Sequence, residues 1–166
     1  MADELSPKSL IIRILFLILI VFFLVLSVLY VNKRWEKIRD IRRQADAKSI
    51  VKALDFYNIQ FGEFPENVDD DGDGWDKTND QEKRTFLNPL VDIGLLPSLV
   101  FDPKNDEDYY YRYQKFAAGE FGCKRSFAVF QVSKFESEPK NVGQGECPDL
   151  NWIQLAPQGY TWFSYE

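Results

Sequence analysis

The 166-residue sequence predicts an α+β protein in which a long N-terminal helix packs its second half on a small antiparallel sheet. Three observations lead to this fold class: an uncharged apolar run near the N-terminus, a long stretch without Gly or Pro, and short aromatic, β-branched runs from Phe86 onward. The expected parts are an N-terminal cytoplasmic tail (1–9), a transmembrane segment (10–31), an extramembrane continuation of the helix (32–61), and a globular head (62–166) with an acidic loop at 66–82.

The apolar run predicts a single membrane anchor. From Ile14 to Val31 the chain has 18 residues without a charge, which as a helix span about 27 Å, close to the hydrocarbon thickness of a bilayer. A cleaved signal peptide or a buried core helix is the alternative, but the run is longer than a signal h-region and no small-residue cleavage site follows it. The side chains expected to contact lipid are Ile14, Phe16, Leu19, Phe22, Leu26 and Val31.

The helix is expected to continue beyond the membrane. No Gly or Pro occurs between Lys8 and Phe61, Pro7 is a suitable first residue, and Gly62 is a suitable stop. A first apolar stripe is formed by Ile38, Ile41 and Ala45, and a second one lies about 150° away on the helix. Two helices separated by a bend are the alternative. The second stripe, expected to pack on the head, is formed by Ile50, Val51, Leu54, Tyr57 and Phe61.

Short strands are expected in the C-terminal part. The best candidates are Tyr109–Phe116 and Phe127–Val132, which are rich in aromatic and β-branched residues and are separated by a Gly-containing segment typical of an antiparallel hairpin. Leu99–Phe101 and Trp152–Leu155 are weaker candidates. A small sheet of this kind buries one face, and the second stripe of the long helix is expected to cover it.

Composition excludes most enzyme classes. The chain has no His, which removes His-based acid–base catalysis and His-activated nucleophiles, and its two Cys are too few for a thiolate zinc site. No other catalytic spacing is recognisable, so the protein is not expected to be an enzyme. Residues 53–166 carry 10 basic and 21 acidic side chains, which disfavours nucleic-acid binding by the head.

The acidic loop predicts a calcium site. Residues 69–80 contain six carboxylates, and the alternating Asp residues before Gly74 match the D-x-D-x-D-G pattern that brings oxygen ligands together on a tight turn. Lys77 stands where a ligand or a water-orienting residue is usual, and a solvated acidic turn is the alternative. With Ca²⁺ as the expected cofactor, the candidate ligands are Asp69, Asp71, Asp73, Trp75 through its carbonyl, Asp76 and Asp80.

The two cysteines leave two interpretations open. Cys123 and Cys147 enclose 23 residues, and pairing in an oxidising compartment would stabilise the fold by about 3–4 kcal/mol through loop closure. Two reduced buried thiols in a cytoplasmic domain are the alternative. The spacing is not C-x-x-C, so a redox-active pair is not expected.

Several short motifs, in their order and spacing over residues 10–135, resemble those of type IV pilin-like proteins, and most closely the major pseudopilins of type II secretion systems. The stretch Arg42 to Tyr57 followed by Gly62–Pro65 resembles the family's Ala-Leu-x-x-Tyr … Gly-x-Tyr/Phe-Pro helix exit. The passage into the sheet is carried by Phe86-Leu87, Leu90-Val91, Gly94-Leu95-Leu96, Asp102-Pro103-Lys104-Asn105 and the Tyr109–Tyr113 cluster.

The resemblance implies a long helix half in the membrane and a head on a small sheet. It also implies assembly through the helices into a filament, with other pilin-like subunits and inner-membrane assembly proteins as partners, the lipid bilayer as surroundings, and a homo-oligomer among the complexes. A C-terminal disulfide loop is common in the family, and Cys123–Cys147 matches it. The family's prepilin signal is missing: residues 1–13 contain no Gly, and no acidic residue lies in the apolar span. An uncleaved, anchored relative that caps or assists the apparatus, or one that never polymerises, is therefore expected.

The remaining predictions concern the orientation of the protein in the membrane and its function. A basic cluster after the span predicts a cytoplasmic head by the positive-inside rule, whereas calcium, a disulfide and the resemblance predict a head outside the cytoplasm. The cluster consists of Lys33, Arg34, Lys37, Arg39, Arg42 and Arg43. We expect a single-pass inner-membrane protein with an extracytoplasmic head that serves as a structural subunit. A calcium-dependent surface module is the alternative, in which Tyr109, Tyr110, Tyr111 and Tyr113 recognise a glycan or protein.

Overall fold

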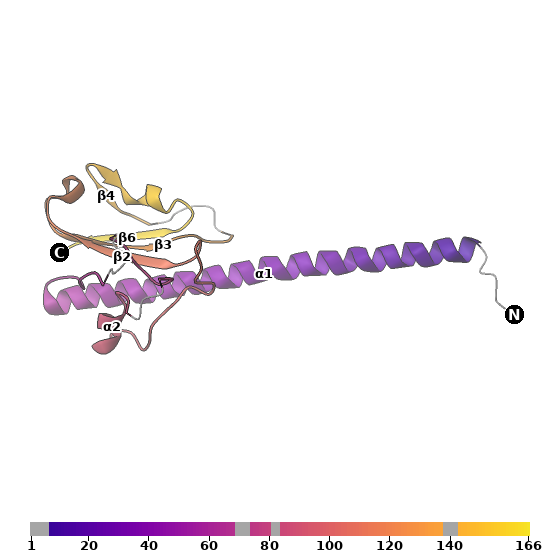
Figure 1. The fold of residues 1–166 in the computed structure, drawn as a ribbon, viewed down its shortest axis with the longest axis horizontal. Helices are drawn as coiled ribbons and strands as arrows, with labels where there is room; N and C mark the ends of the chain where they lie inside the picture. The colour runs from indigo at the N-terminus through magenta and orange to yellow at the C-terminus, as the bar shows by residue number, and fades with distance from the viewer. Residues whose placement is uncertain (1–6, 69–73, 81–83, 138–142) are drawn as a thin grey trace. The chain divides into compact units, whose positions relative to one another are not determined.

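The computed structural model describes residues 7–68, 74–80, 84–137 and 143–166, and it places side chains from Leu10 onward. The chain divides into two compact units, Met1–Ile38 and Arg39–Glu166, and each is considered by itself below. The elements, labelled as in Figure 1, are α1 (Pro7–Phe61), β1 (Asp76–Lys77), α2 (Asn88–Asp92), β2 (Tyr111–Phe116), η1 (Glu120–Gly122), β3 (Phe127–Val132), β4 (Glu146–Cys147), β5 (Leu150–Asn151), η2 (Trp152–Leu155) and β6 (Tyr160–Tyr165).

Helix α1 confirms the expected single helix and both of its ends. It begins at Pro7 and ends at Phe61, and the backbone N–H of Gly62 bonds the carbonyl of Asn58 at 2.8 Å. Gly62 has a φ of 77°, a left-handed conformation that glycine adopts without strain, so the chain turns out of the helix there.

The first unit consists of the apolar part of α1. Every large apolar side chain from Leu10 to Val31 is between 40 and 66% exposed. Ser27 donates its hydroxyl to the carbonyl of Phe23 at 2.8 Å, so this polar group is satisfied within the helix. In the described part of the chain, α1 is the one helix long and apolar enough to cross a membrane, with a mean hydropathy of 3.3 over an 18-residue window.

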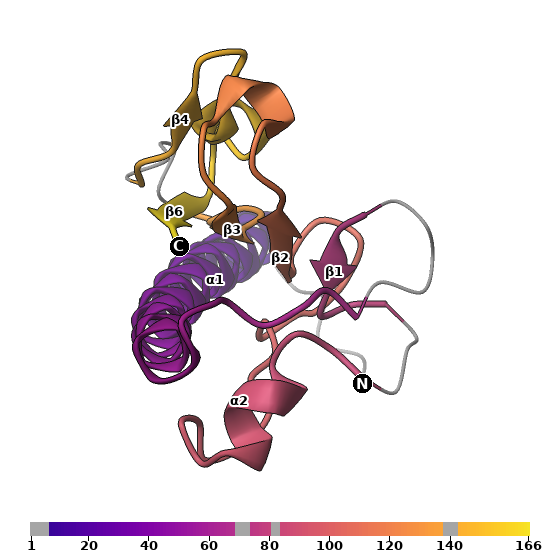
Figure 2. The ribbon, with the colours of Figure 1, turned by 90° about the vertical axis from the view of Figure 1, so that its left-hand side faces the viewer.

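The second unit is built on a four-stranded antiparallel sheet with the order β1-β2-β3-β6, which Figure 2 shows from right to left. Tyr111 pairs with Val132 and Phe116 with Phe127, which confirms the expected hairpin between β2 and β3. On the other side of β3, Phe127 pairs with Tyr165. The α+β class predicted from the sequence is therefore correct.

Both faces of the sheet are covered. On one face lies a first cluster, in which the buried side chains of α1 meet alternate residues of the strands, including Tyr111, Tyr113 and Phe130. On the other face a second cluster forms around Trp152, and it is closed by η2 and by the small β4–β5 hairpin. This double cover explains why all six residues of β3 are buried, a pattern expected of a central strand.

The second stripe of α1 packs on the sheet through its middle residues. Ile50 and Leu54 are fully buried in the first cluster, and Val51 and Tyr57 pack against it while half-buried. Phe61 departs from the expectation, because it is 48% exposed and its ring lies 4.5 Å from that of Tyr57. It is the last residue of the helix, immediately before the chain turns away.

Two expected strands are absent and one strand was missed. Trp152–Leu155 forms a 3₁₀ turn because the side chain of Asn151 accepts the backbone N–H of Ile153 at 3.0 Å and starts the turn. Leu99–Phe101 is irregular, although Leu99 and Val100 pack against the core. Strand β6 was not predicted, even though its aromatic sequence after Gly159 is typical of a strand.

Candidate functional site

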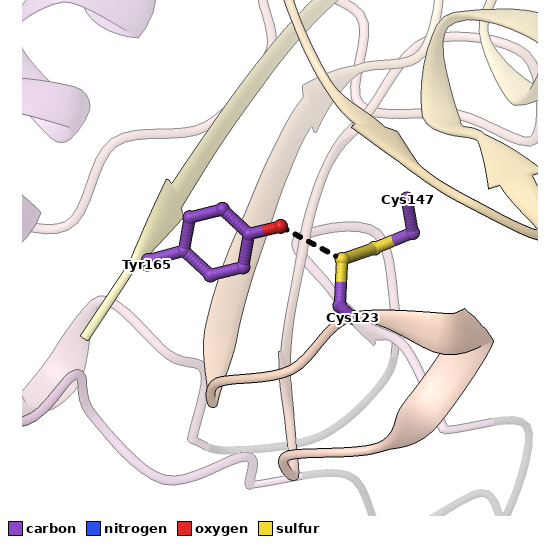
Figure 3. The surroundings of a disulfide bond; sticks show 3 residues. All are labelled: Cys123, Cys147 and Tyr165. Carbon is purple, nitrogen blue, oxygen red and sulfur yellow. Dashed lines mark hydrogen bonds between the residues drawn. A yellow bond between two sulfur atoms is a disulfide. The ribbon is translucent and has the colours of Figure 1, made fainter.

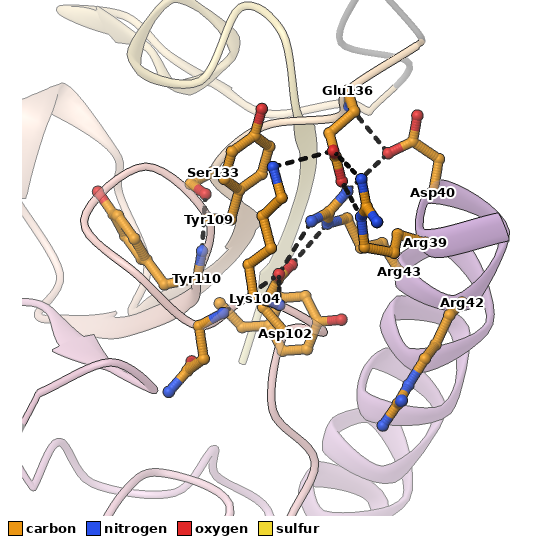
Figure 4. A network of polar contacts seen from close by, with 12 residues as sticks. Arg39, Asp40, Arg42, Arg43, Asp102, Lys104, Tyr109, Tyr110, Ser133 and Glu136 are labelled. Carbon is orange, nitrogen blue, oxygen red and sulfur yellow. Dashed lines mark hydrogen bonds and ion pairs between the residues drawn. The ribbon is translucent and has the colours of Figure 1, made fainter. Parts of the chain in front are cut away.

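The most elaborate polar arrangement in the second unit is an ionic network on the first turn of α1 within that unit (Figure 4). Arg43 is fully buried and binds Asp102 through two hydrogen bonds, Nε to Oδ2 at 2.6 Å and Nη2 to Oδ1 at 3.0 Å. Its Nη1 donates to Asp40 Oδ1 and to Glu136 Oε1, both at 2.8 Å. The guanidinium therefore has a carboxylate on three sides, the strongest form of pairing available to Arg.

Two more cations complete the network. Arg39 binds Glu136 in bidentate fashion, with Nε to Oε1 at 2.6 Å, and Lys104 Nζ lies 2.9 Å from Glu136 Oε2. The ring of Tyr109 covers Arg43, whose Cζ lies 4.6 Å from the ring centroid. Charges balance within the network, which we define as Arg39, Asp40, Arg43, Asp102, Lys104 and Glu136.

Asp40 connects the helix to the segment after β3. Its carboxylate accepts the backbone N–H of Glu136 at 2.9 Å and both the N–H and hydroxyl of Ser137 at 2.6 Å. Asp102 in turn accepts the N–H of Lys104 at 2.9 Å, which fixes the turn at Asp102-Pro103. The network therefore fastens residues 39–43 to two loops that are distant in the sequence.

The network shifts the pKa values of Glu136, Asp40 and Arg43. Hydrogen bonds from Arg39 lower the pKa of Glu136 to about 2, with further help from Lys104 and Arg43 against the cost of burial. Burial by itself raises the pKa of Asp40, but the bonds from Ser137, Glu136 and Arg43 outweigh it and the pKa is lowered. Burial opposes the charge of Arg43, yet its bonds to Asp102 and Glu136 raise its pKa. All three groups stay charged at neutral pH.

This arrangement was not predicted from the sequence, in which Arg39 and Arg43 were counted with a basic cluster next to the membrane. The local signal was the spacing of Asp40 and Arg43, which places them on one helix face. The long-range partners Asp102 and Glu136 carry no such signal. Arg42, in contrast, lies outside the network: its side chain is 63% exposed, and its Nε lies 3.7 Å from Asp46 Oδ2.

The candidate calcium loop lies partly outside the described residues. Asp69, Asp71 and Asp73 fall there, whereas Trp75, Asp76 and Asp80 are described. Asp76 Oδ2 accepts the N–H of Val68 at 2.9 Å, and Asp80 Oδ2 accepts that of Lys77 at 3.3 Å. Within the described ranges, no three His, Cys, Asp or Glu residues are grouped so as to hold a metal ion. The calcium site stays a prediction.

Trp75 has a packing role in the second cluster. Its ring meets Trp152 and Phe116 edge-on, each at a centroid distance of 6.1 Å. On its other side, the Cζ of Arg112 lies 4.2 Å from the ring centroid. The indole is therefore held on the outer face of the sheet, next to the candidate loop.

Cys123 and Cys147 form a disulfide, so the interpretation as reduced thiols is wrong. The bond joins the β2–β3 connection to β4 with a Cα–Cα distance of 5.3 Å, and both residues are buried in the second cluster. Tyr165 donates its hydroxyl to Cys123 Sγ at 3.0 Å (Figure 3). The crosslink thereby ties three segments together at one end of the sheet.

The four tyrosines proposed as a recognition surface do not share one exposed plane. Tyr111 and Tyr113 are fully buried beneath α1, where their hydroxyls donate to Asp46 at 3.0 Å and to the carbonyl of Pro65 at 2.7 Å. Tyr109 covers the ionic network, and Tyr110 is half-buried. The alternation between core and surface explains these residues.

Comparison with protein-family models, with curated proteins and with solved structures finds no match to this chain. Its function is therefore argued from its own residues.

Proposed function

We propose that this protein is a membrane-anchored structural subunit of a pilin-like filament apparatus of the type II secretion or type IV pilus kind. The observation that carries the proposal is the change of environment along α1. Apart from Arg13 and Ser27, the side chains from Leu10 to Val31 are apolar, and they are exposed all around the helix, whereas Ile50 and Leu54 of the same helix are buried against a disulfide-bonded sheet. A lipid-embedded base with a folded head suits a subunit that assembles through its helices.

The buried network supports an extracytoplasmic head. The positive-inside rule counts Lys and Arg near the end of a membrane span, and Arg39 and Arg43 belonged to that count. Both are bound to carboxylates, at 2.6 Å for Arg39 Nε to Glu136 and for Arg43 Nε to Asp102. The disulfide also favours an oxidising compartment. We therefore propose a single pass through the inner membrane with the head outside the cytoplasm.

Calcium is proposed as the cation of the acidic loop on the strength of its sequence pattern. The double variant Asp71→Ala/Asp73→Ala is expected to lose the increase in thermal stability that millimolar Ca²⁺ gives the unaltered chain. Glu107→Ala, a surface carboxylate outside the loop, serves as the control. An equal response of all three chains to Ca²⁺ would contradict the calcium proposal without affecting the anchor.

Topology and assembly have separate tests. Alkaline phosphatase fused after Glu166 is expected to be active, and activity of a cytoplasmic reporter at that position would reverse the orientation.

For assembly, Leu19→Cys is expected to give cross-linked dimers and larger species in intact membranes. Glu107→Cys, on the exposed loop before β2, is the matched control. A Leu19→Cys chain that stays monomeric when expressed with all its native partners would overturn the filament proposal.

A further inference from the structure

Strands β2 and β6 lie on either side of β3, and the backbone groups that they point away from β3 differ in their partners. On the β2 side, Tyr111 is bonded in both directions by Thr78, whose N–H reaches the carbonyl at 2.9 Å and whose Oγ1 accepts the N–H at 3.0 Å. Tyr113 pairs with Asp76 of β1. Beyond β1, Asn67 takes the place of a strand, since its side chain accepts the N–H of Lys115 at 2.7 Å and donates to its carbonyl at 3.4 Å.

Among the described residues, the cover of the β6 edge lies at its beginning. Gln144 N–H bonds the carbonyl of Thr161 at 3.0 Å from outside the sheet, whereas Glu166 N–H bonds Ser126 inward at 3.0 Å. Antiparallel strands alternate between inward and outward backbone groups, so Phe163 and Tyr165 also point outward. Within the described ranges, the N–H and carbonyl of Phe163 and the N–H of Tyr165 have no partner across this edge, while the Tyr165 carbonyl accepts only the nearby Ser164 hydroxyl at 3.5 Å.

Two cations stand beside the open end of this edge. Lys124 and Arg125 are exposed and line a pocket of about 250 Å³ together with Gly122, Cys123, Pro148 and Tyr165. Arg125 Cζ lies 4.7 Å from the centroid of the Tyr165 ring. Neither cation forms an ion pair with a described residue, although Asp149 borders the pocket at Gly122. They are a local positive patch on a strongly acidic head.

We propose that the free edge of β6 binds an extended segment of a partner protein, which adds to the sheet as an antiparallel fifth strand. Open edges of this kind are templates for strand addition, in which the backbone supplies affinity and the flanking side chains supply specificity. In the antiparallel orientation, the N-terminal end of the incoming segment lies at Tyr165. Lys124 and Arg125 select an acidic residue at that end by charge complementarity.

The contrast between the edges makes the proposal specific. Asn67, Thr78 and β1 satisfy the β2 edge, whereas among the described residues the Phe163–Tyr165 portion of β6 offers the donor–acceptor–donor pattern of a ladder. The inference does not depend on the membrane anchor or on filament assembly.

The test uses the full chain in detergent micelles and a synthetic peptide of alternating Thr and Val with two N-terminal Asp residues. Addition of the peptide is expected to slow amide hydrogen exchange at Phe163 and Tyr165 by at least about tenfold, as for a newly formed ladder bond. The amides of Tyr113 and Lys115, on the closed edge, serve as internal controls and should not change.

Two control probes separate backbone pairing from charge. A peptide with N-methylated backbone amides on its β6-facing side is expected to lose the protection. A peptide with Lys in place of Asp, and the Lys124→Glu/Arg125→Glu variant with the original peptide, are each expected to bind at least about tenfold more weakly at low salt. These two cations lie outside the core, so the variant is expected to fold.

Three results would overturn the proposal. One is slow exchange of Phe163 and Tyr165 in the chain without peptide, which would mean that the edge is already covered. Another is equal binding of the acidic and basic peptides. The third is protection that appears with rising protein concentration alone, which would identify a second copy as the occupant.

Discussion

The two halves of α1 have the same backbone conformation and opposite surfaces. Residues 10–31 present apolar side chains in every direction, with exposures up to 66% at Ile12, whereas residues 39–61 bury one face and present mostly polar groups on the rest, interrupted by exposed apolar side chains such as Ile41 and Ile59. Helix formation therefore depends on the absence of Gly and Pro, which both halves share. The distribution of polarity around the axis decides which surroundings each half requires. The following substitutions test that contrast.

The largest effect is expected from Arg43→Met, in the half that meets the sheet. This change leaves the buried carboxylate of Asp102 without its bidentate partner and removes one of the bonds to Asp40, which costs about 3–5 kcal/mol of unfolding free energy. Arg42→Met is the matched control and should cost less than about 0.5 kcal/mol, because Arg42 is 63% exposed and its carboxylate lies 3.7 Å away. Urea unfolding in detergent measures both. Equal losses would show that the network does not stabilise the fold.

A charge in the apolar half should impair membrane insertion. Leu19→Asp is expected to disfavour the transmembrane state by about 3–4 kcal/mol, because a carboxylate replaces a side chain that favours lipid. Ile41→Asp makes the same kind of change in the other half, where the side chain is 57% exposed, and should leave the protein in the membrane. Resistance to carbonate extraction distinguishes the two. If Leu19→Asp chains resist extraction fully, residues 10–31 do not form the anchor.

Removing apolar volume should affect the two stripes of α1 unequally. Leu54→Ala deletes a fully buried side chain from the first cluster and is expected to cost about 2–4 kcal/mol. Ile41→Ala removes an exposed side chain and should change stability by less than about 0.5 kcal/mol. The measurement is the midpoint of urea unfolding, with tryptophan fluorescence as the probe. A large loss for Ile41→Ala would reveal a partner on that face.

Acid should weaken the head through its network, with the smallest effect of the four. The pKa of Glu136 is about 2 in the folded chain and near 4.5 when unfolded, so its contribution is complete above pH 4.5 and is lost as the pH falls toward 2. The raised pKa values of Asp46 and Asp55, due mainly to burial, act in the opposite direction. A net loss on the order of 2 kcal/mol is expected. Glu136→Gln should flatten the profile, and an unchanged slope would contradict this assignment.

Much of the fold was predictable because it depends on local signals. Gly62 marks the end of α1, and the run from Phe127 to Val132 has the same first and last residues as the central strand β3. The calcium ligands rest on a local pattern as well, but three of them lie outside the described residues.

The ionic network was not predictable because its partners are distant in the sequence. Arg43 meets Asp102 and Glu136 across 59 and 93 residues, and a basic residue after an apolar span resembles an ordinary membrane-flanking charge. Trp152 was misassigned for a similar reason. Its apolar neighbourhood indicated a strand, whereas the side chain of Asn151 set the local conformation.

The side-chain amide of Asn67 closes the Lys115 portion of the β2 edge by both donating to and accepting from Lys115. A carboxamide can do both at neutral pH, whereas a carboxylate of the same shape accepts but cannot donate. Spontaneous deamidation at this position would therefore place a negative charge against the Lys115 carbonyl and open that portion of the β2 edge. Ageing samples would then gain a self-association hazard, detectable as a mass increase that accompanies the appearance of aggregates.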